Sequence, residues 1–215
     1  MEASSQVIST VLHHLDLENL IEEDYYDSID HGELVGMIVG LLCKQMGLNG
    51  TFTEKVVQAA YVHDIGKLRL GKILYGRDKQ ALEIESVKYM RMHAQLGMEM
   101  LKECGFQEDI LNAVYHHHEN YDGSGYPDNL KGVQIPLAAR ILRVCDVFAA
   151  LVSHRPYREA FDMNTAVEMM IEDYKSFDMG IFLEFLKLYH SEQFSEVAEL
   201  SKQINAKQRY EKERN

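Results

Sequence analysis

The amino-acid sequence predicts an all-α fold, built as a single helical bundle. Apolar residues recur at helical spacing along most of the 215 residues, and the alternation that marks strands is rare. Hydrophobic residues make up 46% of the chain and charged residues 26%, which is ordinary for a globular domain. Glycine and proline occur close together between His118 and Pro136, and no repeat or linker divides the chain. We therefore expect one helical domain with one structured, glycine-rich loop.

Each helix is expected from its own apolar spacing and boundary residues. The expected ranges are 7–23, 31–46, 51–63, 85–104, 108–117, 136–152, 164–174, 181–189 and 194–213. Thr51 and Glu54 have the spacing of a capping box, with Thr53 as a rival cap for the same helix. Gly66 is expected to break that helix, and Pro136 suits the first turn of a later one.

Composition excludes several classes of protein. The formal net charge of −12 repels a nucleic-acid polymer, so we expect no such partner. No apolar run approaches the ~18 residues that a membrane span needs. The N-terminus lacks a signal sequence, which favours a cytoplasmic protein. The three cysteines, Cys43, Cys104 and Cys145, are widely spaced and are predicted to be buried thiols rather than a disulfide framework or a metal site.

The charge is unevenly distributed. The first 30 residues hold eight acidic residues and no Lys or Arg. The stretch 131–158 instead carries five basic residues against Asp146 alone: Lys131, Arg140, Arg143, Arg155 and Arg158. A local basic patch in an acidic protein favours a small anionic ligand, although a solvated face would account for it equally well.

Histidines and acids occur at positions that suit metal ligands. Asp146 is the most informative, because it is an isolated acid in the apolar run 141–152, where an unpaired carboxylate is costly. The others are Asp27, His31, His63, Asp64, His93, His117 and His118. Each alone has an ordinary structural explanation, such as a surface pair or a core histidine. Together, nitrogen and oxygen donors of this kind suit iron, manganese or zinc, and one bridging carboxylate would give a two-metal hydrolytic site.

The order of these residues resembles the HD-GYP subgroup of the HD-domain metal-dependent phosphohydrolases. The matching motifs are His63-Asp64-Ile65-Gly66-Lys67, His93, His117 to Pro127 with Gly123-Ser124-Gly125-Tyr126-Pro127, Asp146, and Arg155-Pro156-Tyr157-Arg158. The resemblance covers about three-fifths of the chain, from Asp27 to Ala160. It implies an all-helical HD domain that binds two or three divalent metal ions, often iron or manganese. It also implies hydrolysis of cyclic di-GMP to linear pGpG or to GMP.

The resemblance also assigns roles to individual residues. One metal site would consist of His31, His63, Asp64 and Asp146, and Asp64 would bridge to a second metal held by His93, His117 and His118. Asp27 stands where some members use an acid, usually Glu, for a third metal. Asp64 and Lys67 are the expected catalytic residues. The expected substrate-binding residues are Lys67, Gly123, Tyr126, Arg155 and Arg158.

Two departures from the family pattern leave alternatives open. Ala149 and His154 each replace a common Asp, at positions that are not metal ligands. The substrate could therefore be another cyclic dinucleotide or an ordinary nucleotide. A low-activity cyclic-dinucleotide sensor is a further alternative, although the complete ligand set favours an enzyme.

The resemblance also divides the chain. We expect an N-terminal helical extension at 1–24, the HD-GYP-type domain at 25–192 and a charged helical tail at 193–215. A homodimer or a signalling-protein partner is compatible with this organisation.

Overall fold

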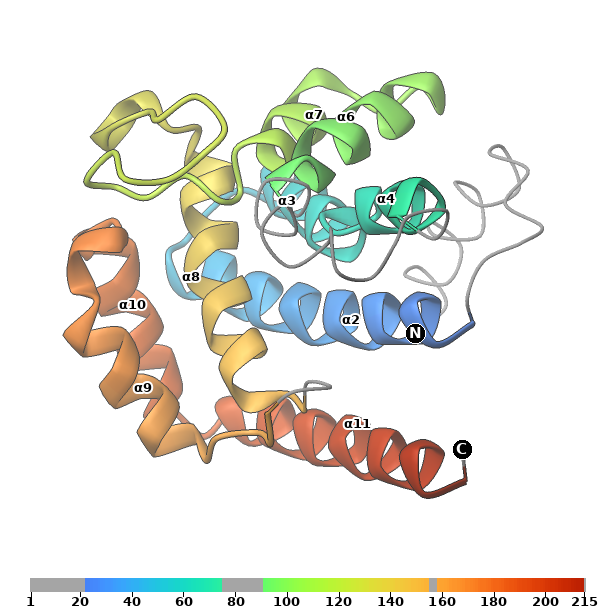
Figure 1. Ribbon diagram of the computed structural model, residues 1–215. Helices are drawn as coiled ribbons and strands as arrows, with labels where there is room; N and C mark the ends of the chain where they lie inside the picture. Colours follow the sequence, from blue (N-terminus) through green and yellow to red (C-terminus); the bar gives the residue numbers. More distant parts are fainter. Residues whose placement is uncertain (1–21, 75–90, 155–157, 215) are drawn as a thin grey trace.

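The computed structural model describes residues 22–74, 91–154 and 158–214, which form a helical bundle (Figure 1). The helices are α2 (Glu22–Gln45), α3 (Gly50–Val62), α4 (Gly66–Leu74), α6 (His93–Glu103), α7 (Glu108–Tyr115), α8 (Leu137–Val152), α9 (Met163–Glu172), α10 (Met179–Tyr189) and α11 (Phe194–Arg214). Two short 3₁₀ turns lie at Gly132–Gln134 and Tyr174–Ser176. No strand occurs in these three ranges, which confirms the all-α prediction.

Helices α2 and α8 pack against each other in the centre of the bundle (Figure 1). Helices α3, α4, α6 and α7 lie on one side of this pair, and α9, α10 and α11 lie on the other. The core is continuous through both sides, and Ile38, Val56, Leu142 and Phe148 are among its fully buried residues. Burial of each such side chain contributes about 1.5–3 kcal/mol. The two central helices are therefore fixed in position by packing on both sides.

Helix α3 begins differently from the prediction. The cap is Asn49, whose side-chain oxygen accepts a hydrogen bond from the Phe52 amide at 2.8 Å. Neither Thr51 nor Thr53 is the cap, because both lie inside the first turn. Asn49 has an extended backbone, which lets its short side chain turn back onto the free amides of that turn.

Two other helix boundaries differ by small amounts. Gly66 was expected to break the helix before it, and in the structure it is the first residue of α4. Pro136 is the residue just before α8 rather than a member of its first turn. The predicted helix at 7–23 lies almost wholly outside the described residues. The part of the predicted 85–104 helix that is described begins as α6 at His93.

The predicted tail at 193–215 is integrated into the bundle. Helix α11 packs on α2, and its Val197 and Ile204 side chains are buried in the common core. Lys207 forms an ion pair with Asp30 of α2 at 2.9 Å. At the other end of the domain, the expected boundary after residue 24 falls within α2.

The structure also locates the three thiols. Cys43 and Cys145 are fully buried and free, as predicted, whereas Cys104 is only partly buried. Along the part of the chain that the structure describes, no helix combines the length and the hydropathy that crossing a membrane requires.

Candidate metal centre

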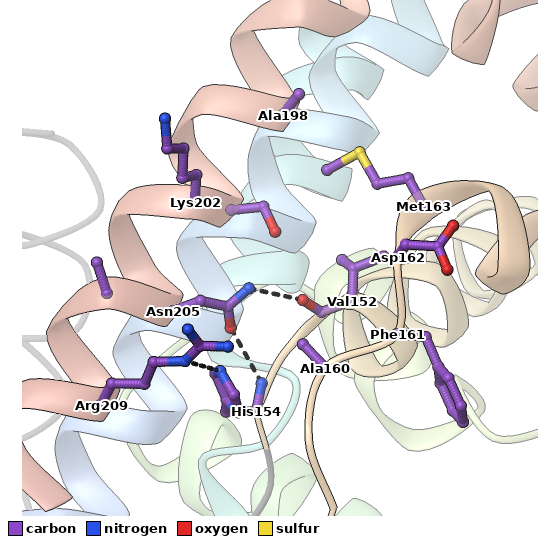
Figure 2. A pocket seen from close by; sticks show the side chains of 12 residues that line it. Val152, His154, Ala160, Phe161, Asp162, Met163, Ala198, Lys202, Asn205 and Arg209 are labelled. Carbon is purple, nitrogen blue, oxygen red and sulfur yellow. Dashed lines mark hydrogen bonds between the residues drawn. The ribbon is translucent and has the colours of Figure 1, made fainter.

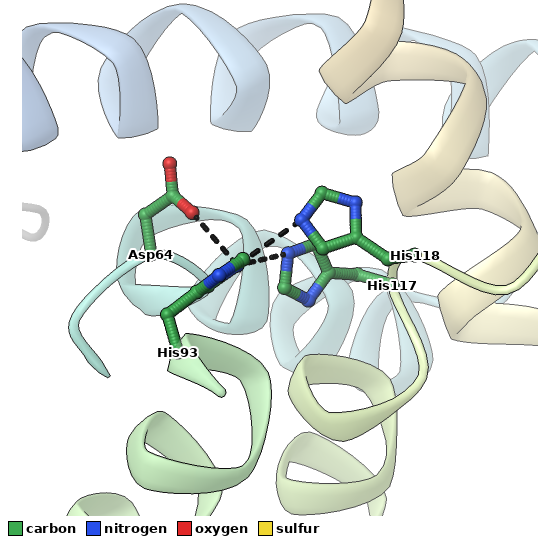
Figure 3. A group of neighbouring side chains, drawn as sticks. All are labelled: Asp64, His93, His117 and His118. Carbon is green, nitrogen blue, oxygen red and sulfur yellow. Dashed lines mark hydrogen bonds and ion pairs between the residues drawn. The ribbon is translucent and has the colours of Figure 1, made fainter. Parts of the chain in front are cut away.

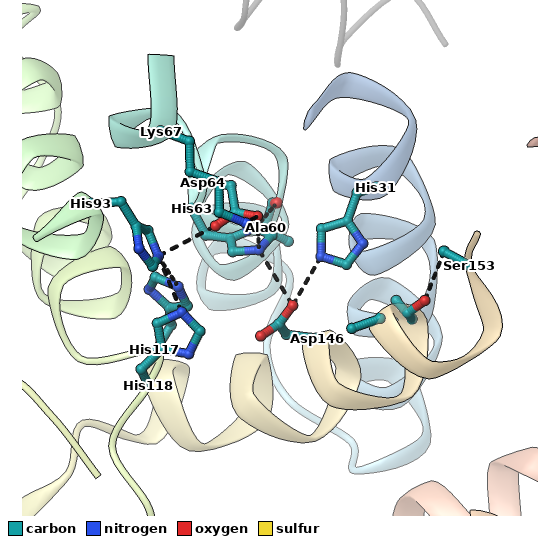
Figure 4. Close-up of polar contacts among 12 residues, drawn as sticks. His31, Ala60, His63, Asp64, Lys67, His93, His117, His118, Asp146 and Ser153 are labelled. Atoms are coloured by element: carbon teal, nitrogen blue, oxygen red, sulfur yellow. Dashed lines mark hydrogen bonds and ion pairs between the residues drawn. The ribbon is translucent and has the colours of Figure 1, made fainter. Parts of the chain in front are cut away.

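Five segments that are distant in the sequence bring their polar side chains to one place (Figure 4). His31 comes from α2, His63 and Asp64 from the end of α3, His93 from the start of α6, His117 and His118 from the turn after α7, and Asp146 from the middle of α8. All are buried except His118, which is partly exposed. The structure therefore brings together every predicted metal ligand whose side chain it describes.

The first group of ligand atoms consists of Asp64, His93, His117 and His118 (Figure 3). His93 Nε2 lies 3.3 Å from His117 Nε2 and 3.1 Å from His118 Nε2. The same atom is 3.4 Å from Asp64 Oδ1. All ligand atoms of the group lie within 4.8 Å of one another. A metal ion holds nitrogen and oxygen donors at about 2.0–2.2 Å, so these separations suit a single ion.

The second group consists of His31, His63 and again Asp64. Asp146 adjoins it, because its Oδ1 is 2.9 Å from His31 Nε2 and 3.5 Å from His63 Nε2. His63 Nε2 is also 3.5 Å from Asp64 Oδ2. The carboxylate of Asp64 thus belongs to both groups, with one oxygen near each.

Backbone carbonyls fix the orientation of two imidazoles. His63 Nδ1 donates a hydrogen bond to the Ala60 carbonyl at 2.8 Å, and His117 Nδ1 donates to the Val114 carbonyl at 2.5 Å. The Nε2 atoms then carry lone pairs, as metal ligands require. His63 Nε2 is buried and has no hydrogen-bond partner among the described residues, although two carboxylates lie 3.5 Å away. A lone pair facing two carboxylates calls for a cation between them, so these residues fit a metal ion.

The electrostatics keep most of the donors in the form that binds metal. Burial lowers the pKa of His118 to about 3 and places that of His117 well below its usual range, so both imidazoles are neutral. Burial alone would raise the pKa of Asp64, but the Lys67 ammonium and nearby histidines outweigh it and hold that pKa well below normal. Burial would raise the pKa of Asp146, but the hydrogen bond with His31 and the nearby His63 imidazole outweigh this effect and hold that pKa low.

His63 shows the opposite shift. Burial would lower its pKa, but the carboxylates of Asp64 and Asp146 outweigh this effect and raise it. The buried carboxylates thus attract a positive charge to His63 Nε2, which is the place where the geometry accommodates a metal ion.

Gly66 explains how Asp64 comes to lie beside His93. A Cβ atom on Gly66 would be 2.0 Å from the His93 carbonyl oxygen and 2.5 Å from the Gly97 amide nitrogen. The start of α4 therefore touches the start of α6, backbone to backbone. Only glycine permits this approach.

The glycine-rich loop places an aromatic ring at the centre. Gly125 packs so tightly that a Cβ atom would be 2.2 Å from the Asn120 amide nitrogen, and Gly123 has a φ of +87°. The Tyr126 ring, whose centroid is 4.8 Å from that of His118, borders the first group of ligands. The predicted tight loop is therefore present beside the histidines.

Glu119 anchors this loop, a role that the sequence reasoning missed. Its buried carboxylate accepts hydrogen bonds from the amides of Asp128 at 2.7 Å and Leu130 at 3.1 Å. The only sequence signal was an acid at the start of a turn-rich segment, and turns of this kind leave backbone amides that need acceptors.

Comparisons with known proteins agree with this arrangement. The HD domain family matches residues 16–181, more than half of the chain. The chain belongs to the HD domain family. The cyclic di-GMP phosphodiesterase response regulator RpfG of Xanthomonas campestris is 39% identical over 63% of this chain and 36% of its own length. The cyclic di-GMP phosphodiesterase PA4108 of Pseudomonas aeruginosa is 32% identical over 85% of this chain and 45% of its own length.

A solved structure supports the same fold. A cyclic GMP-AMP-specific phosphodiesterase from Vibrio cholerae superposes with a TM-score of 0.61 at 19% identity, over 94% of this chain and 52% of that one. These matches confirm the resemblance to HD-GYP-type phosphodiesterases. The chain spans less than half the length of these two curated relatives.

Lys67 lies at the edge of the candidate metal centre. Its Nζ atom is 2.5 Å from Asp64 Oδ2, one helical turn away, and a third of its side chain is exposed. The side chain therefore joins the Asp64 carboxylate, which belongs to both groups, to the solvent-facing side of the site. Its predicted contact with a substrate phosphate stays a prediction.

Three other predicted site residues are not seen at the centre. The side chain of Asp27 and all of Arg155 lie outside the described residues. The Arg158 guanidinium donates hydrogen bonds to the carbonyls of Ala150 at 2.8 Å and Leu151 at 3.1 Å, near the end of α8. It also lies over the Phe161 ring, 4.4 Å from its centroid. Its predicted substrate contact stays a prediction, and the structure gives it the role of a helix cap.

The two departures from the HD-GYP pattern have structural roles. Ala149 is fully buried in the core. His154 accepts a hydrogen bond from Arg209 Nε at 2.8 Å beside a cavity of about 420 Å³ between α11 and the segment after α8 (Figure 2). The His154 amide donates to Asn205 Oδ1 at 3.0 Å. Both positions therefore hold the bundle together.

Proposed function

We propose that this HD domain is a metal-dependent phosphodiesterase that hydrolyses cyclic di-GMP to linear pGpG or to GMP. One observation carries the proposal: the Asp64 carboxylate is shared by two groups of metal-binding side chains. Two ions that share a ligand can hold the attacking and the leaving oxygen of a phosphoryl transfer. The relatives named cyclic di-GMP phosphodiesterase support this substrate.

The proposed metal content is two divalent ions, iron or manganese. The first would be held by Asp64, His93, His117 and His118, and the second by His31, His63, Asp64 and Asp146. The donors are imidazoles and carboxylates without a thiolate, which suits these metals better than a structural zinc cage. Asp27 remains the residue predicted for a third ion.

The side chains around the ions would handle the substrate. Bound divalent ions supply an activated water and neutralise charge on the phosphoryl oxygens. Lys67 orients Asp64 and offers a cation to the phosphate under attack. Tyr126, with the Arg91 guanidinium 5.1 Å from its ring centroid, offers a flat surface on which a purine base can stack.

The experiment is product analysis. Protein purified without oxygen and loaded with iron or manganese is given cyclic di-GMP, and the products are separated by chromatography. Wild type should release pGpG or GMP. Asp64→Ala should release none and should bind less metal, because both groups lose a ligand. Asp109→Ala is the matched control, since Asp109 is an exposed acid paired with Lys55 at 2.7 Å. The absence of product from metal-loaded wild type would refute the proposal.

A second candidate substrate is another cyclic dinucleotide. The structural similarity to a phosphodiesterase named as cyclic GMP-AMP-specific favours testing it. Competition between cyclic di-GMP and the hybrid dinucleotide in one assay would rank the two. Tight binding of either one with negligible turnover would instead support a sensor.

We propose the cytoplasm as the compartment, because the three cysteines are free and two are buried within the core. A homodimer or a signalling-protein partner stays a prediction.

A further inference from the structure

The basic residues of the stretch 131–158 have different surroundings in the structure. Arg140 is held by Asp178, with Nη1 2.5 Å from Oδ2, and donates from Nε to the Ile135 carbonyl at 3.0 Å. Arg158 caps the end of α8. Both guanidinium groups are therefore occupied by the protein itself.

Arg143 differs from both. Its Nε donates a hydrogen bond to Asn120 Oδ1 at 3.1 Å, and no carboxylate among the described residues pairs with it. The side chain is partly buried. A partly buried guanidinium without an anionic partner is costly, because it loses hydration without a compensating charge.

The position of Arg143 relates it to the metal centre. It precedes Asp146 by three residues in α8, so the two side chains share one helix face. Asn120, which holds the guanidinium, lies two residues after His118 and also hydrogen-bonds Ser124 of the glycine-rich loop at 3.0 Å. Arg143 is thus fixed between the helix that supplies Asp146 and the loop that supplies Tyr126.

We propose that Arg143 binds the phosphate of a cyclic dinucleotide that is not being cleaved. This inference rests on the proposed function. A cyclic dinucleotide carries two phosphodiesters, and only one can lie at the metal ions. The second needs a cation elsewhere, and a guanidinium with its Nε anchored keeps two amino groups in a fixed fork that matches phosphate oxygens.

The test compares Arg143→Gln with wild type on two substrates. With cyclic di-GMP, KM should rise about 10-fold or more while kcat changes little, because a charge-assisted hydrogen bond to substrate is lost. Metal content should be unchanged. With bis(4-nitrophenyl) phosphate, which has a single phosphodiester, the kinetics should also be unchanged. Lys187→Gln, an exposed residue of α10, removes the same charge and should behave as wild type on both substrates.

An unchanged KM for cyclic di-GMP would overturn the inference. So would an equal loss on both substrates or a loss of metal, because either would show a structural role. Calorimetric binding of cyclic di-GMP to wild type and Arg143→Gln separates this inference from the proposed function. If wild type binds without turnover and the variant binds at least 10-fold more weakly, the inference stands and the phosphodiesterase fails. If wild type does not bind, both fail.

Discussion

At the scale of single residues, the histidine ligands use the ends of helices. Ala60 and Val114 lie in the last turns of α3 and α7, where carbonyls lack a partner within the helix. The Nδ1 atoms of His63 and His117 donate to these two carbonyls. One hydrogen bond thereby satisfies the helix end and directs the opposite nitrogen toward the centre. The position of a histidine just after a helix is therefore part of the metal site.

Glu119 gives the first prediction at this scale. Replacing Glu119 with Ala would remove the charged acceptor of the Asp128 and Leu130 amides, which should lower the free energy of unfolding by about 2–4 kcal/mol. Urea denaturation measures this change. Turnover should fall as well, because the loop holds Tyr126 beside His118. Glu119→Gln keeps one acceptor oxygen and should lose less. Wild-type stability in the Ala variant would show that the loop does not depend on this carboxylate.

At the scale of helices and loops, the sequence predicts which residues form the helices and the site better than it predicts which side chains contact one another. Apolar spacing located α2, α7, α8 and α10 to within a few residues at most ends, except where α2 begins earlier. The ordered His and Asp motifs also predicted which side chains converge. The caps and cation partners could not be predicted in this way. Asn49 caps α3 and Arg158 caps α8 because of local backbone geometry and tertiary approach, neither of which residue spacing encodes.

The contact between α4 and α6 gives a prediction about elements. Gly66→Ala would place a methyl group 2.0 Å from the His93 carbonyl oxygen and force the two helices apart. We expect a loss of about 1–3 kcal/mol in unfolding free energy. Metal content should also fall, since His93 would move away from Asp64. Gly50→Ala is the matched control, because no atom lies within 4 Å of its added Cβ. Full metal content in Gly66→Ala would show that the centre tolerates this displacement.

At the scale of the whole molecule, α11 connects parts of the bundle that carry the metal ligands. Asn205 donates from Nδ2 to the Val152 carbonyl at 2.9 Å and accepts from the His154 amide at 3.0 Å (Figure 2). Asn205→Ala removes both bonds at the end of α8. The free energy of unfolding should fall by about 1–2 kcal/mol, measured by thermal or urea denaturation. Lys202→Ala, on the same helix, removes an exposed side chain and should change little. Equal effects of the two changes would mean that Asn205 does not hold the helices together.

The packing of α2 against α8 predicts how the stability of the whole domain responds to alkaline pH. Burial raises the pKa of the Cys43 thiol from 9.0 to about 11. Below about pH 9 the thiol is neutral in both the folded and the unfolded chain, so it adds no pH dependence. Between about pH 9 and 11 it ionises only in the unfolded chain, and stability should fall as pH rises.

Urea denaturation at several pH values between 8 and 11 measures this slope. Cys43→Ala should be less stable at every pH but should show a shallower decline, because the ionising thiol is absent. Cys104→Ser is the control, since Cys104 is only partly buried and should leave the slope closer to that of wild type. An unchanged slope in Cys43→Ala would mean that this thiol does not couple the α2–α8 core to pH. A shallower slope would show that the interior which positions His31 and Asp146 stays closed to solvent in the native state.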